Sequence, residues 1–404
     1  MKKTEINKGF IIFLSLICLV AITLEMINGR FWLTDFQVYY SAAHNFLSAG
    51  AVYHVCFDSG SGFYKYSPVI LFFFIPYTLL SYKIASVIHF TVLAFALGYT
   101  YTLLLRILKK YFPGNGIRRE GLLLSLSFIG ILVPFTREMH LGNINILILL
   151  LSCQAVMLYI EEKPFSGSLL LGLVVLAKPF YLLLILPLIL RKQWKAIGWL
   201  GAVLAAGSIL PFFLHGIDYT MTLYSGWFST MIGHSTDYPG MSSLGYLIRH
   251  NLFPTMPGFA EYVIIFLYCG LMTWFITYNK IQEEKVKDDN FTMHGNFFFE
   301  WILMLSFMSL LFRTDWVLLL LTAPLITFIV FYISQTKRFW LIPILVIFLF
   351  FYGANSDDLL GKGLSGSILR SGLMGLGNFC IVILALILFL DFRKMKANKN
   401  SLHE

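Results

Sequence analysis

Long apolar runs follow one another along this chain, and short polar connectors separate them. A run of about 20 apolar residues is long enough to cross a bilayer as a helix. The pattern therefore predicts an all-α, polytopic membrane protein with about twelve spans. The expected spans lie at residues 9–28, 67–81, 84–106, 120–136, 142–160, 166–190, 194–214, 259–279, 297–312, 315–334, 338–353 and 371–390.

The longest polar interruption near the start is residues 31–68, and it predicts a short amphipathic helix lying on the membrane surface. Thr34 and Gln37 have the spacing of a capping box, and Gly50 is a suitable stop. Asp35 falls in the first turn, either as an ordinary helix-start acid or as a carboxylate facing a ligand from the water side. The apolar residues at the spacing of one helical face are Phe36, Tyr39, Tyr40, Ala43, Phe46 and Leu47.

Composition agrees with a membrane protein. Hydrophobic residues make up 58% of the 404 residues, charged residues 13%, and the mean hydropathy is +0.76, which excludes a soluble globular class. The net charge of +9 gathers in short loops and at the two ends, which fits the cytoplasmic bias of Lys and Arg better than nucleic-acid binding. The five scattered cysteines predict neither a disulfide framework nor a metal site. The first apolar run has no small-residue cleavage site after it, so we interpret it as a retained span.

The distribution of charge predicts which loops face the cytoplasm. The expected cytoplasmic segments are 1–8, 191–195, 280–289, 337–338 and 393–399. The expected outer segments are 29–66, 215–258, 313–315 and 354–370. We therefore expect one integral membrane domain over residues 1–404, with a first outer loop at 29–66, a second at 215–258 and a basic cytoplasmic tail at 391–404. Chemistry is expected on the outer face, because long polar loops over a rigid scaffold commonly carry it.

One region does not fit a regular alternation. If 67–81 and 84–106 both cross, the basic loop at 109–119 lies outside, against the charge rule. Either 67–81 does not fully cross and 166–190 is two half-helices meeting at Lys178, or 166–190 is one proline-kinked span. Both alternatives put Lys178 deep in the membrane, where an ammonium needs an anionic partner. That partner is either a buried acid such as Glu138 or a lipid phosphate.

Several function classes have no support. The sequence shows no internal repeat and no inverted pair of interrupted helices, which argues weakly against a transporter. It also has no Walker A loop, HExxH, CxxC or GxSxG, so a nucleotide-driven pump, a zinc protease and a serine hydrolase are not indicated.

Short stretches stand in a characteristic order between about residue 30 and residue 325. They are Asp35-Phe36-Gln37-Val38-Tyr39-Tyr40, Tyr64-Lys65-Tyr66-Ser67-Pro68, Gly142-Asn143-Ile144-Asn145, Leu176-Ala177-Lys178-Pro179 leading to Arg191-Lys192-Gln193-Trp194, and Gly240-Met241-Ser242-Ser243-Leu244 before Arg249. In this order of parts the chain resembles the family 87 glycosyltransferases. That group of membrane mannosyltransferases includes the enzyme that adds a late mannose to phosphatidylinositol mannosides.

Two departures from the family pattern affect the expected site. Members tend to carry glutamine where this chain has Asn143. They also carry a tryptophan with a histidine pair in a late outer junction, where this chain reads Phe312-Arg313-Thr314-Asp315-Trp316. Either Arg313 or Asp315 takes over phosphate or sugar contacts at this junction, or the chain uses a different donor or acceptor.

The resemblance implies a GT-C fold and an inverting transfer from a polyprenyl-phosphate sugar to a lipid or glycan acceptor, at the extracytoplasmic face of the cell (inner) membrane. Asp35 is the implied general base, because transfer requires a group that takes the acceptor's proton. The expected contacts to the donor phosphate are Lys178, Arg249 and Arg313, although Arg249 has an equal reading as an interfacial anchor. The expected substrate contacts are Tyr39, Tyr40, Tyr64, Tyr66, Asn143, His250 and Asp315.

We expect membrane lipids as partners, and neither a nucleic acid, a cofactor nor a required metal. The main rival from another class is a transporter or flippase of lipid-linked or polar solutes, which would also bury polar groups in the membrane. A non-enzymatic assembly protein of the cell envelope is a weaker alternative.

Overall fold

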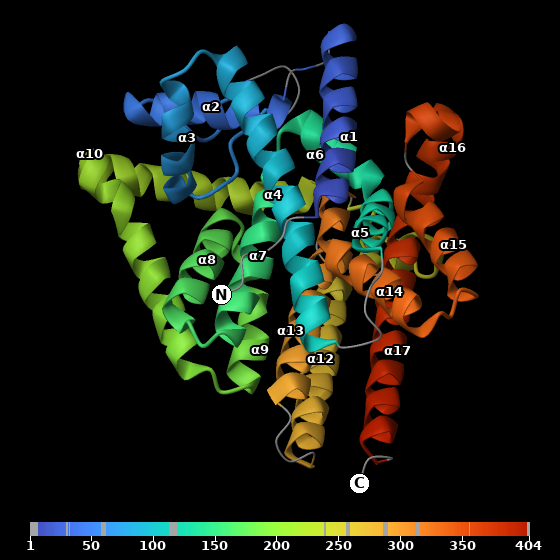
Figure 1. The fold of residues 1–404 in the computed structure, drawn as a ribbon. Coiled ribbons are helices and arrows are strands. Elements are labelled where there is room, and N and C mark those ends of the chain that lie inside the picture. The colour runs from blue at the N-terminus through green and yellow to red at the C-terminus, as the bar shows by residue number, and fades with distance from the viewer. Residues whose placement is uncertain are drawn as a thin grey trace. The chain divides into compact units, whose positions relative to one another are not determined.

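The structure, a computed structural model, describes residues 7–29, 31, 33–57, 62–112, 119–237, 240–255, 259–285, 290–311, 316–354 and 356–401. The described residues form α-helices and short 3-10 helices joined by turns and loops, so this part of the chain is all-α as expected (Figure 1). The chain divides into two compact units, each of which is built from separate stretches of sequence. Unit 1 comprises residues 1–13, 101–135 and 239–404, and unit 2 comprises residues 14–100 and 136–238.

Unit 2 contains the first outer segment and the Lys178 region. Two helices, α1 (Lys8–Ile27) and α4 (Tyr82–Tyr111), begin or end in unit 1. The remaining elements are α2 (Thr34–Leu47), η1 (Pro68–Ile70), α3 (Leu71–Thr78), most of α6 (Leu132–Leu141), α7 (Asn145–Ile160), α8 (Pro164–Ala177), η2 (Pro179–Leu184), α9 (Ile185–Leu190) and α10 (Trp194–Asp237). Helices α7 and α10 both pack on α8.

Unit 1 contains α5 and most of the second half of the chain. Its elements are α5 (Glu120–Ile129), α11 (Leu244–Asn251), α12 (Ala260–Lys285), α13 (Asn290–Leu311), η3 (Trp316–Thr322), α14 (Ala323–Thr336), α15 (Leu341–Gly353), α16 (Asp357–Ser371) and α17 (Leu373–Ser401). The core includes large fully buried side chains such as Trp301, Tyr332 and Tyr352. The hydroxyl of Thr322 and the amide of Asn378 meet inside this core at 2.7 Å, so a hydrogen bond ties η3 to α17.

The described residues contain fewer helices of spanning length than the twelve spans expected. Among the described residues, seven helices are long and apolar enough to cross a membrane, or eight if α5 and α6, which meet at a 70° bend, count as one. The remaining expected spans, 67–81, 142–160, 166–190 and 338–353, form apolar helices of 10–17 residues. A helix of 16 residues rises about 24 Å, short of a hydrocarbon core of about 30 Å. None of these helices is long enough to cross the hydrocarbon core alone.

Segment 166–190 is broken at the expected place. Helix α8 ends at Ala177, Lys178 is extended with φ −139° and ψ 102°, and Pro179 opens η2. Proline lacks an N–H and disfavours the helical conformation in the residue before it, so helix α8 cannot continue through this position. The break leaves Lys178 between two helical pieces rather than on a continuous span.

The second expected outer loop is largely helical. Helix α10 continues past residue 214 to Asp237, and it bends at Gly216, which has φ 73° and ψ −171° (Figure 1). Helix α11 then occupies part of the remaining stretch. The loop predicted at 215–258 is therefore mostly two helices in the described residues.

Helix α2 has the expected bounds but a different start and environment. Its N-cap is Leu33 in the left-handed region (φ 45°), with no side-chain cap hydrogen bond, so the predicted capping box of Thr34 and Gln37 is wrong. The helix stops at Leu47 because Ala49 turns left-handed (φ 52°) and the Gly50 N–H donates to the Asn45 carbonyl at 2.8 Å.

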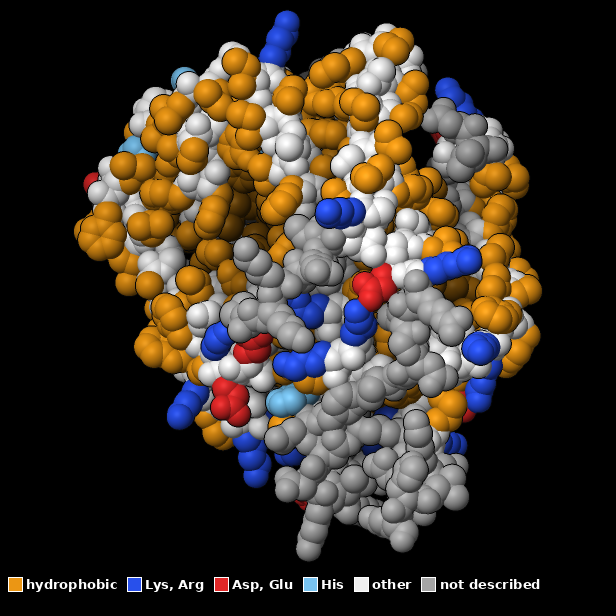
Figure 2. All heavy atoms as spheres, in the orientation of Figure 1, with side chains coloured by type: hydrophobic (Ala, Val, Ile, Leu, Met, Phe, Trp, Pro, Cys, Tyr) orange, Lys and Arg blue, Asp and Glu red, His pale blue; other side chains and the backbone are white. Residues whose placement is uncertain are grey.

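The apolar face of α2 packs against protein in this structure. Phe36, Ala43 and Phe46 are fully buried, and α3 packs against the helix. Burying a phenylalanine side chain contributes roughly 1.5–3 kcal/mol, so these contacts fix the helix in unit 2. The expected surface-lying helix is thus part of a packed layer. Exposed apolar side chains cover wide areas of the face shown in Figure 2, as suits contact with lipid.

Candidate active site

The start of α2 is held against the turn that joins α6 to α7. Gly142 in this turn has φ +66°, and a β-carbon there would lie 2.9 Å from the Phe36 β-carbon. The carbonyl of Gly142 accepts from His89 Nε2 at 2.9 Å, and the His89 ring stacks on Phe36 with centroids 4.2 Å apart. This close approach brings the first turn of α2, with Asp35, to the residue after Gly142.

Asn143 holds the carboxylate of Asp35. Its Nδ2 donates to Asp35 Oδ2 at 2.6 Å. The other end of the amide, Oδ1, accepts from the Tyr66 hydroxyl at 3.0 Å and from the Ile144 N–H at 2.7 Å. Because two donors occupy Oδ1, the NH2 group must face Asp35. Both Asp35 and Asn143 are half-buried.

The clustered tyrosines form a buried support for this pair. The hydroxyls of Tyr39 and Tyr66 are 3.0 Å apart, and the Tyr53 hydroxyl donates to the Tyr66 carbonyl at 2.7 Å. Tyr64 is fully buried, and its hydroxyl donates to the Ser67 carbonyl at 3.2 Å. Burial raises the pKa of both Tyr39 and Tyr66 well above the ordinary phenol value. Tyr66 therefore stays protonated at neutral pH and remains a donor to Asn143.

Lys178 lies on another side of Tyr66. Its Nζ donates to Asn145 Oδ1 at 2.6 Å and lies 5.6 Å from the centroid of the Tyr66 ring. The Lys178 residue is half-buried. Tyr66 therefore contacts both parts of the site. Its hydroxyl bonds to Asn143, which holds Asp35, and its ring face lies beside the Lys178 ammonium.

Glu138 orients Asn145 from inside the protein. This fully buried carboxylate accepts the Asn145 N–H at 2.5 Å and the Ile146 N–H at 3.3 Å through Oε1, and the Asn145 Nδ2 at 3.0 Å through Oε2. A carboxylate on the free amides of the first turn stabilises the start of α7. It also turns the Asn145 carbonyl oxygen toward Lys178. The acid considered as a partner of Lys178 is therefore linked to it through an asparagine.

The cluster combines two chemical capacities. A half-buried carboxylate can take a proton from a hydroxyl group, and a half-buried ammonium can bind an anion or stabilise a negative charge that develops beside it. The buried groups Glu138, Asn145 and Tyr66 fix the positions of both. Among the residues that the structure describes, no group of three or more His, Cys, Asp or Glu side chains is placed to hold a metal ion.

The other predicted site residues lie outside this cluster or outside the described residues. The Tyr40 hydroxyl donates to the Leu80 carbonyl at 2.8 Å, and the Tyr40 ring packs against Tyr82. Half-buried Arg249 and exposed His250 belong to α11 of unit 1, where His250 stacks on Tyr246 with ring centroids 5.4 Å apart. Arg313 and Asp315 lie outside the described residues.

Sequence reasoning missed the supporting residues. Asn145 stands in the quoted Gly142–Asn145 stretch, and Glu138 was considered only as an ion-pair partner. His89 gave no signal, because a lone histidine in an apolar helix has no recognisable pattern. The polar stretch Arg137-Glu138-Met139-His140 between two apolar runs was the one available hint for Glu138.

A comparison with protein families identifies a match over most of this region. The model described as glycosyltransferase family 87 matches residues 63–306, which is more than half of the 404 residues. Tyr66, Glu138, Asn143, Asn145 and Lys178 all fall within the matched range, whereas Asp35 precedes it. Neither the curated proteins nor the solved structures gave a match to the chain.

Proposed function

The chain belongs to glycosyltransferase family 87, and from that premise we propose that it moves a sugar from a polyprenyl-phosphate donor to a lipid or glycan acceptor. Membership of the family, together with seven apolar helices of spanning length in the described residues, makes it a membrane glycosyltransferase. The proposal adds the class of donor, the residues that act on it, inversion at the sugar, and a site on the extracytoplasmic face of the cell (inner) membrane. A mannose or another hexose or pentose is the proposed sugar.

One observation carries the proposal: a half-buried carboxylate and a half-buried ammonium are both held in place around the same tyrosine. Asp35 is fixed by Asn143, and Lys178 is fixed by Asn145. Transfer between a hydroxyl acceptor and a phosphate-activated sugar needs one group of each sign. The base takes the acceptor proton, and the cation stabilises the charge on the departing phosphate.

In the proposed reaction, the acceptor oxygen attacks the anomeric carbon on the face opposite the phosphate, which inverts the configuration there. Asp35 takes the proton of the acceptor hydroxyl as the new carbon–oxygen bond forms. The bond between the anomeric carbon and the phosphate oxygen breaks, and its electron pair stays on the polyprenyl phosphate. Lys178 lies against that phosphate, and Arg249 and Arg313 are proposed as further cations for it.

The buried tyrosines have a supporting part in this proposal. Tyr66 donates to Asn143 and is 6% exposed, so its main action on substrate is through the residues it holds. Tyr39 and Tyr64 pack around it and are buried as well. In this proposal Asn143 acts mainly by holding Asp35 and contacts the sugar only secondarily. His250 and Asp315 of unit 1 are proposed as further sugar contacts.

The test of the donor site compares the two lysines that flank α8. Lys178 follows the helix, whereas Lys163 precedes it and forms an exposed pair with Glu161 at 2.7 Å. In proteoliposomes supplied with a polyprenyl-phosphate sugar, Lys178→Met should raise the donor KM at least about tenfold, because a hydrogen bond to a charged group contributes roughly 1.5–3 kcal/mol. Lys163→Met should leave the donor KM unchanged.

Two results would contradict the proposal at different levels. An unchanged donor KM in Lys178→Met would remove this lysine from the phosphate site while leaving the transferase intact. If the wild type transfers no sugar from any polyprenyl-phosphate donor and instead moves the labelled donor between leaflets, the donor class is wrong and the flippase alternative holds.

A further inference from the structure

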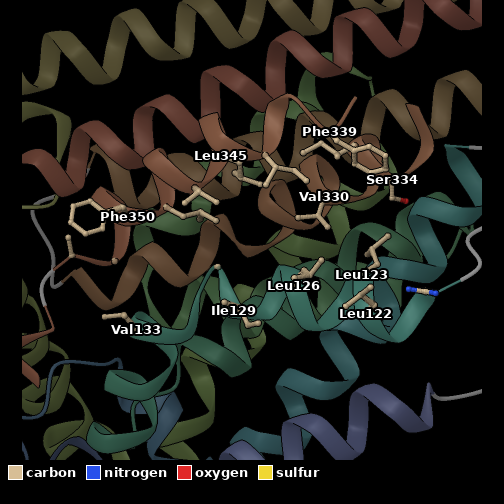
Figure 3. A pocket seen from close by; sticks show the side chains of 18 of the residues that line it. Leu122, Leu123, Leu126, Ile129, Val133, Val330, Ser334, Phe339, Leu345 and Phe350 are labelled. Atoms are coloured by element: carbon tan, nitrogen blue, oxygen red, sulfur yellow. The ribbon is translucent and has the colours of Figure 1, made fainter. Parts of the chain in front are cut away.

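Unit 1 contains an apolar groove that the proposed reaction does not use. The groove has a volume of about 1070 Å³ and lies between α5, α14 and α15. Figure 3 shows Leu122, Leu123, Ser334 and Phe339 toward one end and Val133 and Phe350 toward the other. We call this cavity the α5–α15 groove. Its long axis follows the two helices after which it is named.

Both walls of the groove are open on one side. Leu122, Leu126 and Ile129 recur at helical spacing along α5, and each is about half exposed. On α15 the matching stripe is Ile342, Val346 and Phe350, which are also about half exposed. Two facing apolar stripes with an open side form a trough that a flexible hydrocarbon chain can enter from the bilayer.

The groove is narrow at the end that contains Val133. A β-carbon added to Gly130 would lie 3.0 Å from Ile326 Cγ2 and 3.3 Å from Leu349 Cδ2. A β-carbon added to Gly353 would lie 3.5 Å from Val133 Cγ2. The helices therefore approach each other closely here, and an occupant must have its thin, apolar part at this end.

The opposite end carries positive charge. Arg119 and Lys337 are the charged side chains among the described lining residues, and both are exposed. The next residue, Arg338, forms an ion pair at 2.8 Å with Asp391 of α17. Asp391 is followed closely in the sequence by the basic residues Arg393 and Lys394. A cluster of basic residues at the ends of spans marks the cytoplasmic boundary of the membrane.

We propose that the α5–α15 groove binds one anionic phospholipid of the cytoplasmic leaflet, with its phosphate against Arg119 and Lys337 and an acyl chain along the stripes. The length of the groove agrees with this occupant. Helix α15 rises about 17 Å from Ile342 to Gly353, close to the roughly 15 Å of a single leaflet's hydrocarbon. The cytoplasmic leaflet is also where anionic lipids supply the negative charge that two exposed basic side chains attract. This site is independent of the proposed sugar transfer.

The charge of the groove is tested by titrating the purified full-length protein in detergent with phosphatidylglycerol and, separately, with phosphatidylcholine, using native mass spectrometry. The wild type should bind phosphatidylglycerol more tightly. The double variant Arg119→Gln/Lys337→Gln should weaken phosphatidylglycerol binding about 25-fold, about fivefold for each basic residue, and bring it near phosphatidylcholine. The control Lys362→Gln/Arg370→Gln removes the same two charges from exposed positions on α16 and should bind as the wild type does.

The hydrocarbon part is tested by two neighbouring residues of α15. Val346 lines the groove, whereas the adjacent Ile347 is equally exposed but does not line it. Val346→Trp should fill the trough and reduce binding of both lipids. Ile347→Trp should have no effect, which separates occupancy of the groove from general lipid contact.

Three results would overturn the assignment. The wild type could show no preference for phosphatidylglycerol, the Arg119→Gln/Lys337→Gln variant could bind it as tightly as the wild type, or Val346→Trp and Ile347→Trp could behave alike. Addition of a polyprenyl phosphate distinguishes the other source of a lipid phosphate. Displacement of phosphatidylglycerol at equal concentration would assign the groove to the donor lipid instead.

Discussion

Asn143 determines how the carboxylate of Asp35 is presented. Its amide oxygen accepts from Tyr66 and Ile144, so the amide cannot rotate without losing two hydrogen bonds, and its NH2 group stays directed at Asp35. This hydrogen bond fixes the Asp35 oxygen that accepts it. Asn143 is therefore expected to act on the reaction mainly by positioning the base.

Asn143→Leu should lower kcat per folded protein about tenfold to hundredfold with little change in the donor KM. The reason is the loss of a hydrogen bond to a charged group, which contributes roughly 1.5–3 kcal/mol. Asn143→Gln keeps the amide and should recover much of the rate. Steady-state kinetics in proteoliposomes checks both variants, and a rise in KM with an unchanged kcat would show that Asn143 only binds substrate.

At the scale of residues, sequence pattern and resemblance singled out Asp35, Tyr66, Asn143 and Lys178, and the structure brings these four together. Asp35 and Asn143 are 108 residues apart in the chain, so no local pattern could have shown their bond. The sequence also did not show that Glu138 and Asn145 position Lys178. Their hydrogen bonds depend on the turn between α6 and α7, whose left-handed Gly142 cannot be inferred from a lone glycine.

At the scale of elements, the turn at Gly142 connects α6 to α7 and packs against the start of α2. The sequence predicted a helix in this stretch, because its apolar spacing records the face that packs against protein. It did not predict the start, where Leu33 is left-handed and the Thr34 side chain makes no cap. The conformation at Leu33 is imposed by tertiary contact, since its side chain is buried beside Gly142 and the Tyr82 hydroxyl lies 3.2 Å from its carbonyl.

Gly142→Ala should destabilise the protein and reduce transfer. The substitution puts a β-carbon 2.9 Å from the Phe36 β-carbon and 3.0 Å from the Leu33 β-carbon, at a backbone φ of +66° that costs about 1–2 kcal/mol for a residue other than glycine. Thermal unfolding in detergent should show a lower Tm. Gly201→Ala in α10 is the matched control, because its added β-carbon meets no atom within 4 Å and alanine favours the helix. Equal Tm values for the two variants would contradict the strained contact.

At the scale of the whole molecule, hydropathy identified the class of protein, and the described residues contain fewer helices of spanning length than the twelve spans predicted. Segment 67–81 contains only η1 and α3, whose apolar part ends at Thr78, and α15 has 13 residues. A short apolar helix can be surrounded by protein, enter the bilayer in part, or cross it together with a second short helix, and hydropathy alone cannot distinguish these cases. The assignment of faces to the loops stays a prediction.

Cys56 offers a direct test of that assignment. It is the exposed cysteine among the five, and it lies in the first expected outer segment, whereas Cys18 and Cys153 are buried. A membrane-impermeant maleimide applied to intact cells, with the outer membrane opened where there is one, should therefore label the wild type but not Cys56→Ser. Labelling that appears only after the inner membrane is permeabilised would place residues 29–66, and with them Asp35, on the cytoplasmic side.

The central claim, that Asp35 is the general base, is tested most directly by measuring donor binding and sugar transfer on the same preparation of Asp35→Asn. Asparagine keeps an oxygen for Asn143, so the variant should fold and bind the polyprenyl-phosphate sugar as the wild type does. Its transfer rate should fall by about 10²–10⁴, the usual contribution of a general base. The control Asp218→Asn makes the same change at an exposed acid of unit 2 and should retain full activity. Transfer by Asp35→Asn at the wild-type rate would contradict the account.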